Sequence, residues 1–161
     1  MQRIIDEIKG CTEHQYFLAA LVLALAIPDV CSSYERKKLK DKKYYYPQWC
    51  NKWFEDDFKI DGKVIYALRC SMMHKLNCNI KKEPIYKKHK AEQPPDSPEE
   101  IYRFFIPGTD TPNGITYYQE SKQNIKHELC ISRLIYQIIF AYEAFQKAYP
   151  DFKFDFGRNW I

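Results

Sequence analysis

The sequence predicts a mainly α-helical fold, a helical bundle with one inserted β-hairpin. Apolar residues recur at helical spacing, most clearly over 131–145, whereas 101–106 and 115–119 are rich in aromatic and β-branched residues. A chain of 161 residues is long enough to bury one real core. We therefore expect a single domain over 1–161, in which 79–121 form an insertion made of a polar loop and the hairpin.

Two helices are predicted at the start of the chain. The first covers 2–9, and Gly10 provides its stop signal. The second is apolar on every side over 16–27, which is typical of a helix buried in the centre of a bundle or at a subunit contact. Pro28 predicts a kink, after which the helix resumes as far as Glu35.

A basic loop and two further helices are expected next. Residues 36–43 are rich in lysine and poor in apolar residues, which predicts a loop. Pro47 is placed to open a helix that runs to about Phe58. Asp61 is positioned to cap the following helix. The apolar face of that helix includes Val64, Leu68 and Met72.

The second half of the chain contains the predicted hairpin. Residues 77–98 are polar and contain four prolines, so they predict an irregular crossing. The Pro-Gly-Thr-Asp-Thr-Pro-Asn-Gly stretch at 107–114 is strong turn chemistry between the two strand-like runs. A long helix over 123–148 follows, and the alternating phenylalanines of 151–161 predict a short strand or a surface arm.

The expected location of the protein is the cytoplasm. Its six cysteines do not come with a secretion signal, so we expect reduced thiols rather than three disulfides. The apolar run at 17–27 is shorter than the about 20 residues that cross a membrane. We expect no association with a membrane.

Basic residues gather in two clusters, although the net charge of +4 is modest. Such clusters suit an acidic partner such as RNA, but solvated loops have the same composition. Aromatic residues follow the first cluster, and they suit either stacking on unpaired bases or packing onto the core. The candidate RNA-binding residues of this cluster are Lys37, Lys38, Lys40, Lys42 and Lys43.

One motif stands out in the predicted helix after Asp61. Residues 66–74 read Tyr-Ala-Leu-Arg-Cys-Ser-Met-Met-His, which places Arg69 five residues before His74. This resembles the Arg-x4-His motif of HEPN proteins. The order of segments also resembles a family of HEPN-like bacterial proteins of uncharacterised role, and the resemblance covers residues 15–148. Those segments are the apolar run ending in Pro28 and Asp29, then Trp53 and Phe54, the motif, a strand near Arg103 to Phe105 and the long final helix.

The resemblance implies metal-independent RNA cleavage by a toxin or defence effector. The composite site would form where two protomers of a homodimer pair their motif helices, and no cofactor is implied. Its catalytic residues would be Arg69 and His74, with Asp29 and Ser71 in support. The partners implied are single-stranded RNA and, as a regulator, an antitoxin or a nucleotidyltransferase.

The residue types of the motif fit this chemistry. A histidine that titrates near neutrality takes a proton from a ribose 2′-hydroxyl or gives one to the leaving oxygen. An arginine stabilises the charge that develops on the phosphate oxygens. Five residues rotate about 140° around a helix, so Arg69 and His74 do not share a face. Either the helix ends near His74 or a second chain completes the site.

Three alternatives stay open. Catalytic HEPN motifs commonly have Asn, Asp or His after the arginine, where this chain has Cys70, and non-catalytic branches of the family serve as binding partners. Asp29 is the candidate ion-pair partner of Arg69, an arrangement that favours a structural role. Cys70, His74 and Cys78 have the four-residue spacing of zinc ligands on one helical face.

His127 is expected to be a solvated residue at the start of the long helix.

Overall fold

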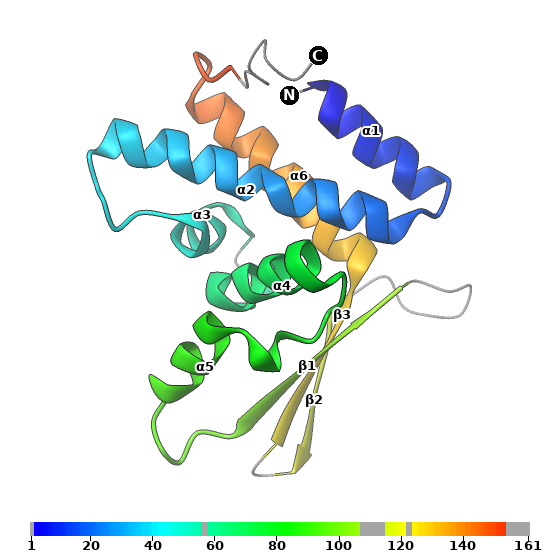
Figure 1. Ribbon diagram of the computed structural model, residues 1–161, viewed down its shortest axis with the longest axis vertical. Coiled ribbons are helices and arrows are strands. Elements are labelled where there is room, and N and C mark those ends of the chain that lie inside the picture. The colour runs from blue at the N-terminus through cyan, green and yellow to red at the C-terminus, as the bar shows by residue number, and fades with distance from the viewer. Residues whose placement is uncertain (1, 56–57, 107–114, 122–123, 154–161) are drawn as a thin grey trace.

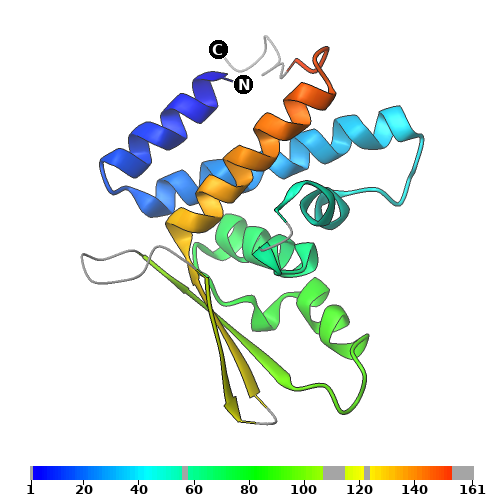
Figure 2. The same cartoon turned by 180° about the vertical axis from the view of Figure 1, so that it is seen from behind.

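The computed structural model describes residues 2–55, 58–106, 115–121 and 124–153, and helices dominate these ranges, which confirms the predicted mainly helical fold. In Figures 1 and 2, α1 to α4 and α6 form one body, and a small sheet extends from it with α5 alongside. The helices are α1 (Gln2–Glu13), α2 (Phe17–Leu39), α3 (Tyr46–Trp53), α4 (Gly62–Lys75), the short 3₁₀ helix η2 (Ile80–Lys82), α5 (Pro84–Ala91) and α6 (Ile131–Ala148).

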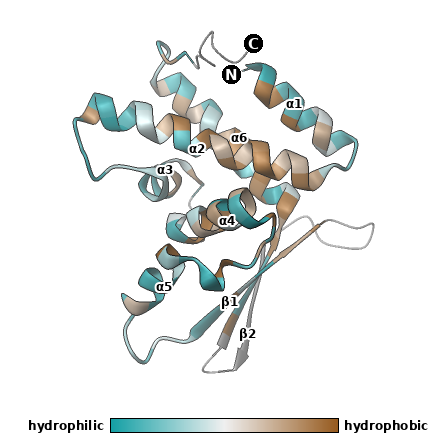
Figure 3. Cartoon of the chain, viewed as in Figure 1, coloured by the Kyte–Doolittle hydropathy of each residue, from teal (hydrophilic) through white to brown (hydrophobic). Residues whose placement is uncertain are grey.

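Helix α2 is central to the bundle, since it packs against α1, α3, α4 and α6. Leu21, Ala24 and Leu25 of this helix are fully buried. Figure 3 shows hydrophobic residues concentrated where α2 crosses α6. In length and composition α2 is also a candidate membrane span. The core helix of a soluble protein meets the same criteria, and α2 is buried in the core and has a charged C-terminal end.

The predicted ends of the first two helices were wrong. Helix α1 continues through Gly10, and α2 continues through Pro28 as far as Leu39, so that 36–39 are helical rather than part of a loop. Proline removes one backbone donor, and the packing of α2 on four neighbouring helices outweighs this loss. Three basic residues in the last turn also interact favourably with the helix dipole.

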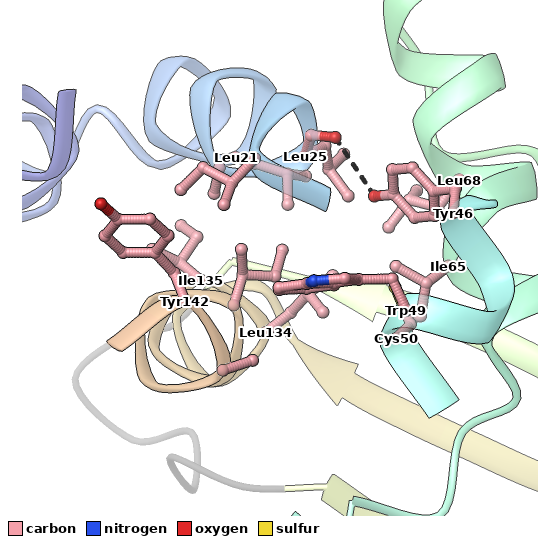
Figure 4. Packing of buried hydrophobic residues seen from close by; sticks show 14 of the residues in the cluster. Leu21, Leu25, Tyr46, Trp49, Cys50, Ile65, Leu68, Leu134, Ile135 and Tyr142 are labelled. Carbon is pink, nitrogen blue, oxygen red and sulfur yellow. Dashed lines mark hydrogen bonds between the residues drawn. The ribbon is translucent and has the colours of Figure 1, made fainter. Parts of the chain in front are cut away.

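Helices α3 and α4 close the core beside α2. Pro47 opens α3 as predicted, but α3 ends at Trp53 rather than near Phe58, because Phe54 has an extended conformation. Figure 4 shows the fully buried Trp49 of α3 among side chains of α2, α4 and α6. The Tyr46 hydroxyl donates a hydrogen bond of 3.2 Å to a backbone carbonyl of α2, which fixes the position of α3.

The sheet differs from the predicted hairpin. Its strands are β1 (Glu99–Phe105), β2 (Ile115–Ser121) and β3 (Asn124–Cys130), in the order β1-β3-β2. Strand β3 is parallel to β1 and antiparallel to β2, so β1 and β2 do not pair with each other. Residues 124–130 were predicted as the start of the long helix, which begins at Ile131 instead. Backbone hydrogen bonds on both edges of β3 stabilise the strand: those on one edge come from the preceding strand β2, and those on the other come from β1, which is distant in sequence.

The polar segment before the sheet also contains unpredicted structure. Pro84 opens α5, and η2 precedes it, so 77–98 are not an irregular crossing throughout. The predicted turn at 107–114 lies outside the described residues. So does most of the predicted tail, although Phe152 is buried and its ring lies 4.9 Å from that of Tyr34.

We expect added methyl groups at two helical glycines to change the stability of the fold in opposite directions. A Cβ at Gly10 has open space inside α1, so Gly10→Ala should raise the free energy of unfolding by about 0.5–1 kcal/mol. A Cβ at Gly62 would overlap the Pro47 carbonyl oxygen, so Gly62→Ala should lower it by about 1–3 kcal/mol. Urea unfolding of both variants checks this, and an equal change in both would contradict the packing of α3 on α4.

Candidate functional site

Helix α4 carries both motif residues, and its two ends have clear local causes. Asp61 caps the start as predicted, because its carboxylate accepts a hydrogen bond of 2.7 Å from the Lys63 N–H. Leu76 closes the other end in a left-handed conformation (φ 49°), with its N–H bonded to the Met72 carbonyl. The helix therefore ends one residue after His74, which confirms the predicted end and leaves His74 exposed in the last turn.

Arg69 forms an ion pair with Asp29 of α2, the pair that the sequence suggested. The Nη2 and Nε atoms of Arg69 lie 2.7 Å and 2.8 Å from Asp29 Oδ2. Burial raises the pKa of Asp29 above its ordinary value, although the guanidinium acts in the opposite direction. Burial acts to lower the pKa of Arg69, but Asp29 outweighs it, so the guanidinium remains charged.

Arg69 and His74 lie at the two margins of the exposed face of α4. The opposite face is buried, with Val64, Leu68 and Ser71 in the core. At 100° per residue, Met73 falls between the two motif residues. Within one chain, the structure brings Arg69 to Asp29 and directs His74 toward solvent from the other margin.

Ser71 lies on the buried face and organises the segment after α4. Its hydroxyl oxygen is 2.7 Å from Asn77 Oδ1 and 3.1 Å from the Asn79 carbonyl oxygen. Asn77 Oδ1 also accepts a hydrogen bond of 2.9 Å from the Asn79 N–H. Ser71 therefore supports the position of the segment that follows His74, and it does not contact Arg69 among the described hydrogen bonds.

The five candidate lysines surround the C-terminal end of α2. Two of them lie in the last helical turn, Lys40 ends the helix in a left-handed conformation, and the other two lie in the following loop. All five are exposed. Together with Arg36 they form what we call the α2 basic patch, the residues Arg36, Lys37, Lys38, Lys40, Lys42 and Lys43.

Two neighbouring cavities connect the α2 basic patch to Asp29. The first, about 350 Å³, is lined by four residues of the patch. The second, about 250 Å³, is lined by Asp29, Ser32, Ser33 and four tyrosines, and it shares Arg36 with the first. The two cavities therefore lie in succession along one side of α2, between the Arg69–Asp29 ion pair and the lysines of the patch.

A buried carboxylate near the same end of α2 was not found from the sequence. Glu35 is fully buried and accepts hydrogen bonds from the hydroxyls of Tyr44 (2.7 Å) and Tyr149 (2.9 Å) and from the Trp53 indole N–H (2.9 Å). Lys52 forms an ion pair with it. These five residues, the Glu35 cluster, join α2, α3, the loop between them and the end of α6. The sequence signal that could have revealed it is an acidic residue directly before the basic run 36–43, followed by a segment rich in tyrosine and tryptophan.

The Glu35 cluster holds its carboxylate in the charged form. Burial alone acts to raise the pKa of Glu35, but the hydrogen bonds from Lys52, Trp53 and the two tyrosines lower it below its ordinary value. Burial and the nearby carboxylate raise the pKa of Tyr149 to about 12, so this donor stays protonated.

A second polar cluster lies between α5 and the sheet. The Glu100 carboxylate accepts hydrogen bonds of 3.1 Å from the Gln93 amide and the Tyr102 hydroxyl, and His127 Nε2 lies 3.7 Å away. The interaction with His127 is the largest cause of the lowered pKa of Glu100. His127 is buried in β3 and stacks on Tyr102, with 4.5 Å between ring centroids, so the prediction of a solvated helical histidine was wrong.

The six thiols are free, and all of them lie in described parts of the chain. Cys78 lies beyond the end of α4, with its sulfur 3.6 Å from that of Met72, so Cys70, His74 and Cys78 do not form one helical face. Among the described residues, no group of three His, Cys, Asp or Glu side chains is arranged to hold a metal ion.

Comparison with family models, with curated proteins and with solved structures gave no match to this chain. The HEPN resemblance, which is based on the motif and the order of segments, stays a prediction.

The Glu35 cluster predicts a specific dependence of stability on pH. Because the folded pKa of Glu35 is below the ordinary 4.5, its contribution is complete above that pH and is lost as the pH falls through the folded value. Glu35→Gln should lower the free energy of unfolding by about 2–4 kcal/mol at pH 7, with a smaller difference below pH 4. Urea unfolding across this range measures it.

The matched control is Glu143→Gln, which changes an exposed carboxylate on α6. This control should follow the wild type at every pH. A Glu35→Gln protein whose stability loss is the same at pH 3 and pH 7 would show that the charge of Glu35 does not stabilise the fold.

Proposed function

We propose that this chain is a metal-independent endoribonuclease of HEPN type that acts as a homodimer. The observation that carries the proposal is the exposed face of α4, where Arg69 and His74 lie on either side of Met73. Met73 is 43% exposed, and Leu76, just past the helix, is 79% exposed. Exposed apolar side chains with charged residues at their margins favour contact with a second copy of the same face.

Two-fold symmetry completes the site in this proposal. A two-fold axis midway along the motif, with the two α4 helices antiparallel, brings Arg69 of each protomer beside His74 of the other. Arg69 and His74 of one helix are separated by about 140° around its axis, but this separation does not prevent a shared site, because each site contains one residue from each chain. Activity is therefore tied to dimerisation.

The proposed chemistry uses His74 for proton transfer and Arg69 for the phosphate. The imidazole takes the proton of a ribose 2′-hydroxyl, whose oxygen attacks the adjacent phosphorus. The bond from phosphorus to the 5′-oxygen breaks, that oxygen takes a proton from solvent water, and a 2′,3′-cyclic phosphate remains on the other product. Asp29 engages two nitrogen atoms of Arg69 and fixes the guanidinium in place. The remaining N–H groups of Arg69 are directed to the charged phosphate oxygens.

The α2 basic patch is the proposed path of the RNA. Single strands bind grooves that combine positive charge with aromatic side chains. The cavity between Asp29 and Arg36 has four tyrosines in its lining and opens onto the patch. We assign the activity to a cytoplasmic toxin or defence effector, regulated by an antitoxin or nucleotidyltransferase partner.

A non-catalytic HEPN-like binding or dimerisation module is the second candidate. The observation that favours it is the Arg69–Asp29 ion pair, which joins α4 to α2 and gives Arg69 a structural use. The cysteine at position 70, where catalytic motifs commonly have Asn, Asp or His, also favours the non-catalytic module. The same exposed face of α4 would then serve only as a contact surface.

Cleavage of mixed single-stranded RNA in the presence of a chelator tests the first candidate. His74→Ala should reduce the rate by about 10²–10⁴-fold, because general acid–base catalysis contributes that much. Arg69→Ala should abolish cleavage as well. His14→Ala is the matched control, since His14 is an exposed histidine at the end of α1 and should leave the rate unchanged.

Mixing the two inactive variants separates a composite site from a site within one chain. Heterodimers of His74→Ala and Arg69→Ala should regain part of the activity, because one of their two sites is intact. Sedimentation should show a dimer for the wild type. A monomeric wild type, or a wild type that binds RNA without cutting it, would favour the binding module.

The salt dependence of RNA binding tests the α2 basic patch. Replacement of its five lysines by glutamine in the His74→Ala background should weaken binding of a single-stranded oligonucleotide. It should also reduce the slope of log K against log salt by about 0.7 for each phosphate that the protein no longer neutralises. Replacing the exposed Lys82, Lys87 and Lys88 is the control and should change the slope less. Salt-insensitive binding by the wild type would defeat the assignment.

A further inference from the structure

A large cavity lies apart from the α4 face. It is a groove of about 1030 Å³ between 77–81 on one side and 101–106 on the other, and Tyr86 and Glu128 complete its lining. We call it the β1 groove. Its volume is at the upper end for a small-molecule pocket, and its open, elongated lining suits a length of chain.

The β1 groove follows the edge of a strand. Successive side chains of a strand point to opposite faces of the sheet, so a cavity that meets six consecutive residues, 101–106, passes the edge of β1. At Glu128, the register partner of Arg103, it also extends over one face of the sheet. Within the described sheet β1 is the terminal strand and pairs with β3 on its other edge. The groove therefore runs beside the edge of β1 that no described strand covers.

The opposite wall of the groove is held in place. Hydrogen bonds from Ser71 to Asn77 and to the Asn79 carbonyl fix the start of this wall against α4. At the other end, the Tyr86 hydroxyl donates a hydrogen bond of 3.1 Å to the Glu100 carbonyl and attaches α5 to β1. The slot is thus preformed, which lowers the cost of binding a partner.

The lining specifies the chemistry of the occupant. Apolar and aromatic side chains dominate, and Ile106 at the end of the strand is 48% exposed. Lys81 and Arg103 are the cations of the lining and both are exposed, whereas the acid Glu128 pairs with Lys126 at 3.5 Å. Arg103 points to one face of the sheet, and Tyr102 and Phe104 point to the other.

We propose that the β1 groove binds an extended segment of a partner protein, which adds to the sheet as a fourth strand beside β1. Backbone groups of the segment pair with the open edge of β1, and its side chains alternate between acidic residues on the Arg103 face and apolar residues on the Phe104 face. Six residues of extended chain span about 20 Å, the length of β1 along the groove.

The groove favours a peptide over an RNA strand. Edge strands offer a row of N–H and C=O groups that another peptide strand satisfies completely. The stronger concentration of positive charge is the α2 basic patch, which lies at the far end of α2 in Figure 1. A peptide site in the β1 groove does not depend on the nuclease proposal, because neither Arg69 nor His74 lines it.

Synthetic peptides test the site in the absence of RNA. The probe is a fluorescein-labelled peptide with the alternating sequence Val-Glu-Val-Asp-Val-Glu-Val, and binding is followed by fluorescence anisotropy and by amide hydrogen exchange. We expect saturable binding with slower exchange over 101–106. A peptide with lysine in place of each acid, and one with N-methyl groups on alternate amides, should each bind at least tenfold more weakly.

A charge-reversed protein gives the matched comparison. The double variant Lys81→Glu and Arg103→Glu changes two exposed side chains and should invert the preference in favour of the lysine peptide, with unchanged thermal unfolding. Equal binding of acidic and basic peptides, no slowing of exchange over 101–106, or slowing by a uridine oligonucleotide instead of the peptide would each overturn the proposal. So would self-association of the wild type that the double variant abolishes.

Discussion

The end of α2 is held in the bundle by one buried carboxylate. Glu35 receives donors from the loop after α2, from α3 and from Tyr149 just beyond α6, so three segments meet at one charge. A buried carboxylate is tolerated only when its oxygens are fully paired, and the loss of any donor would leave an uncompensated charge. This requirement fixes where α3 and the end of α6 pack relative to α2.

That constraint also sets the geometry of the candidate site. With the end of α2 fixed, Asp29 lies six residues earlier, at the crossing with α4, and pairs with Arg69. The α2 basic patch projects from the turn after Glu35, where burial of the carboxylate leaves the lysines on the solvent side. The bundle thus presents a cation-rich helix end and the motif face of α4 from a rigid core, while the sheet and the β1 groove extend away from it.

Local patterns predicted some elements well and others poorly. The Asp61 cap, the opening of α3 at Pro47 and the end of α4 after His74 depend on neighbours within a few residues, and each was predicted. Strand β3 was predicted as helix, because Ile125, His127 and Leu129 alternate for only a short run before a long helical pattern begins. One of its partners, β2, directly precedes it, but the other, β1, lies about twenty residues earlier in the chain.

By itself, the sequence determined the helical class of the fold, the apolar character of the central helix and the positions of Arg69 and His74 on one helix near its end. These properties follow from periodicity and capping, which act over one or two turns. Only the tertiary structure decided that α2 passes through Pro28, that His127 is buried against Tyr102, and that Glu35 is the meeting point of three segments. Each of these depends on contacts between residues distant in sequence, whose energies exceed the local preferences that they override.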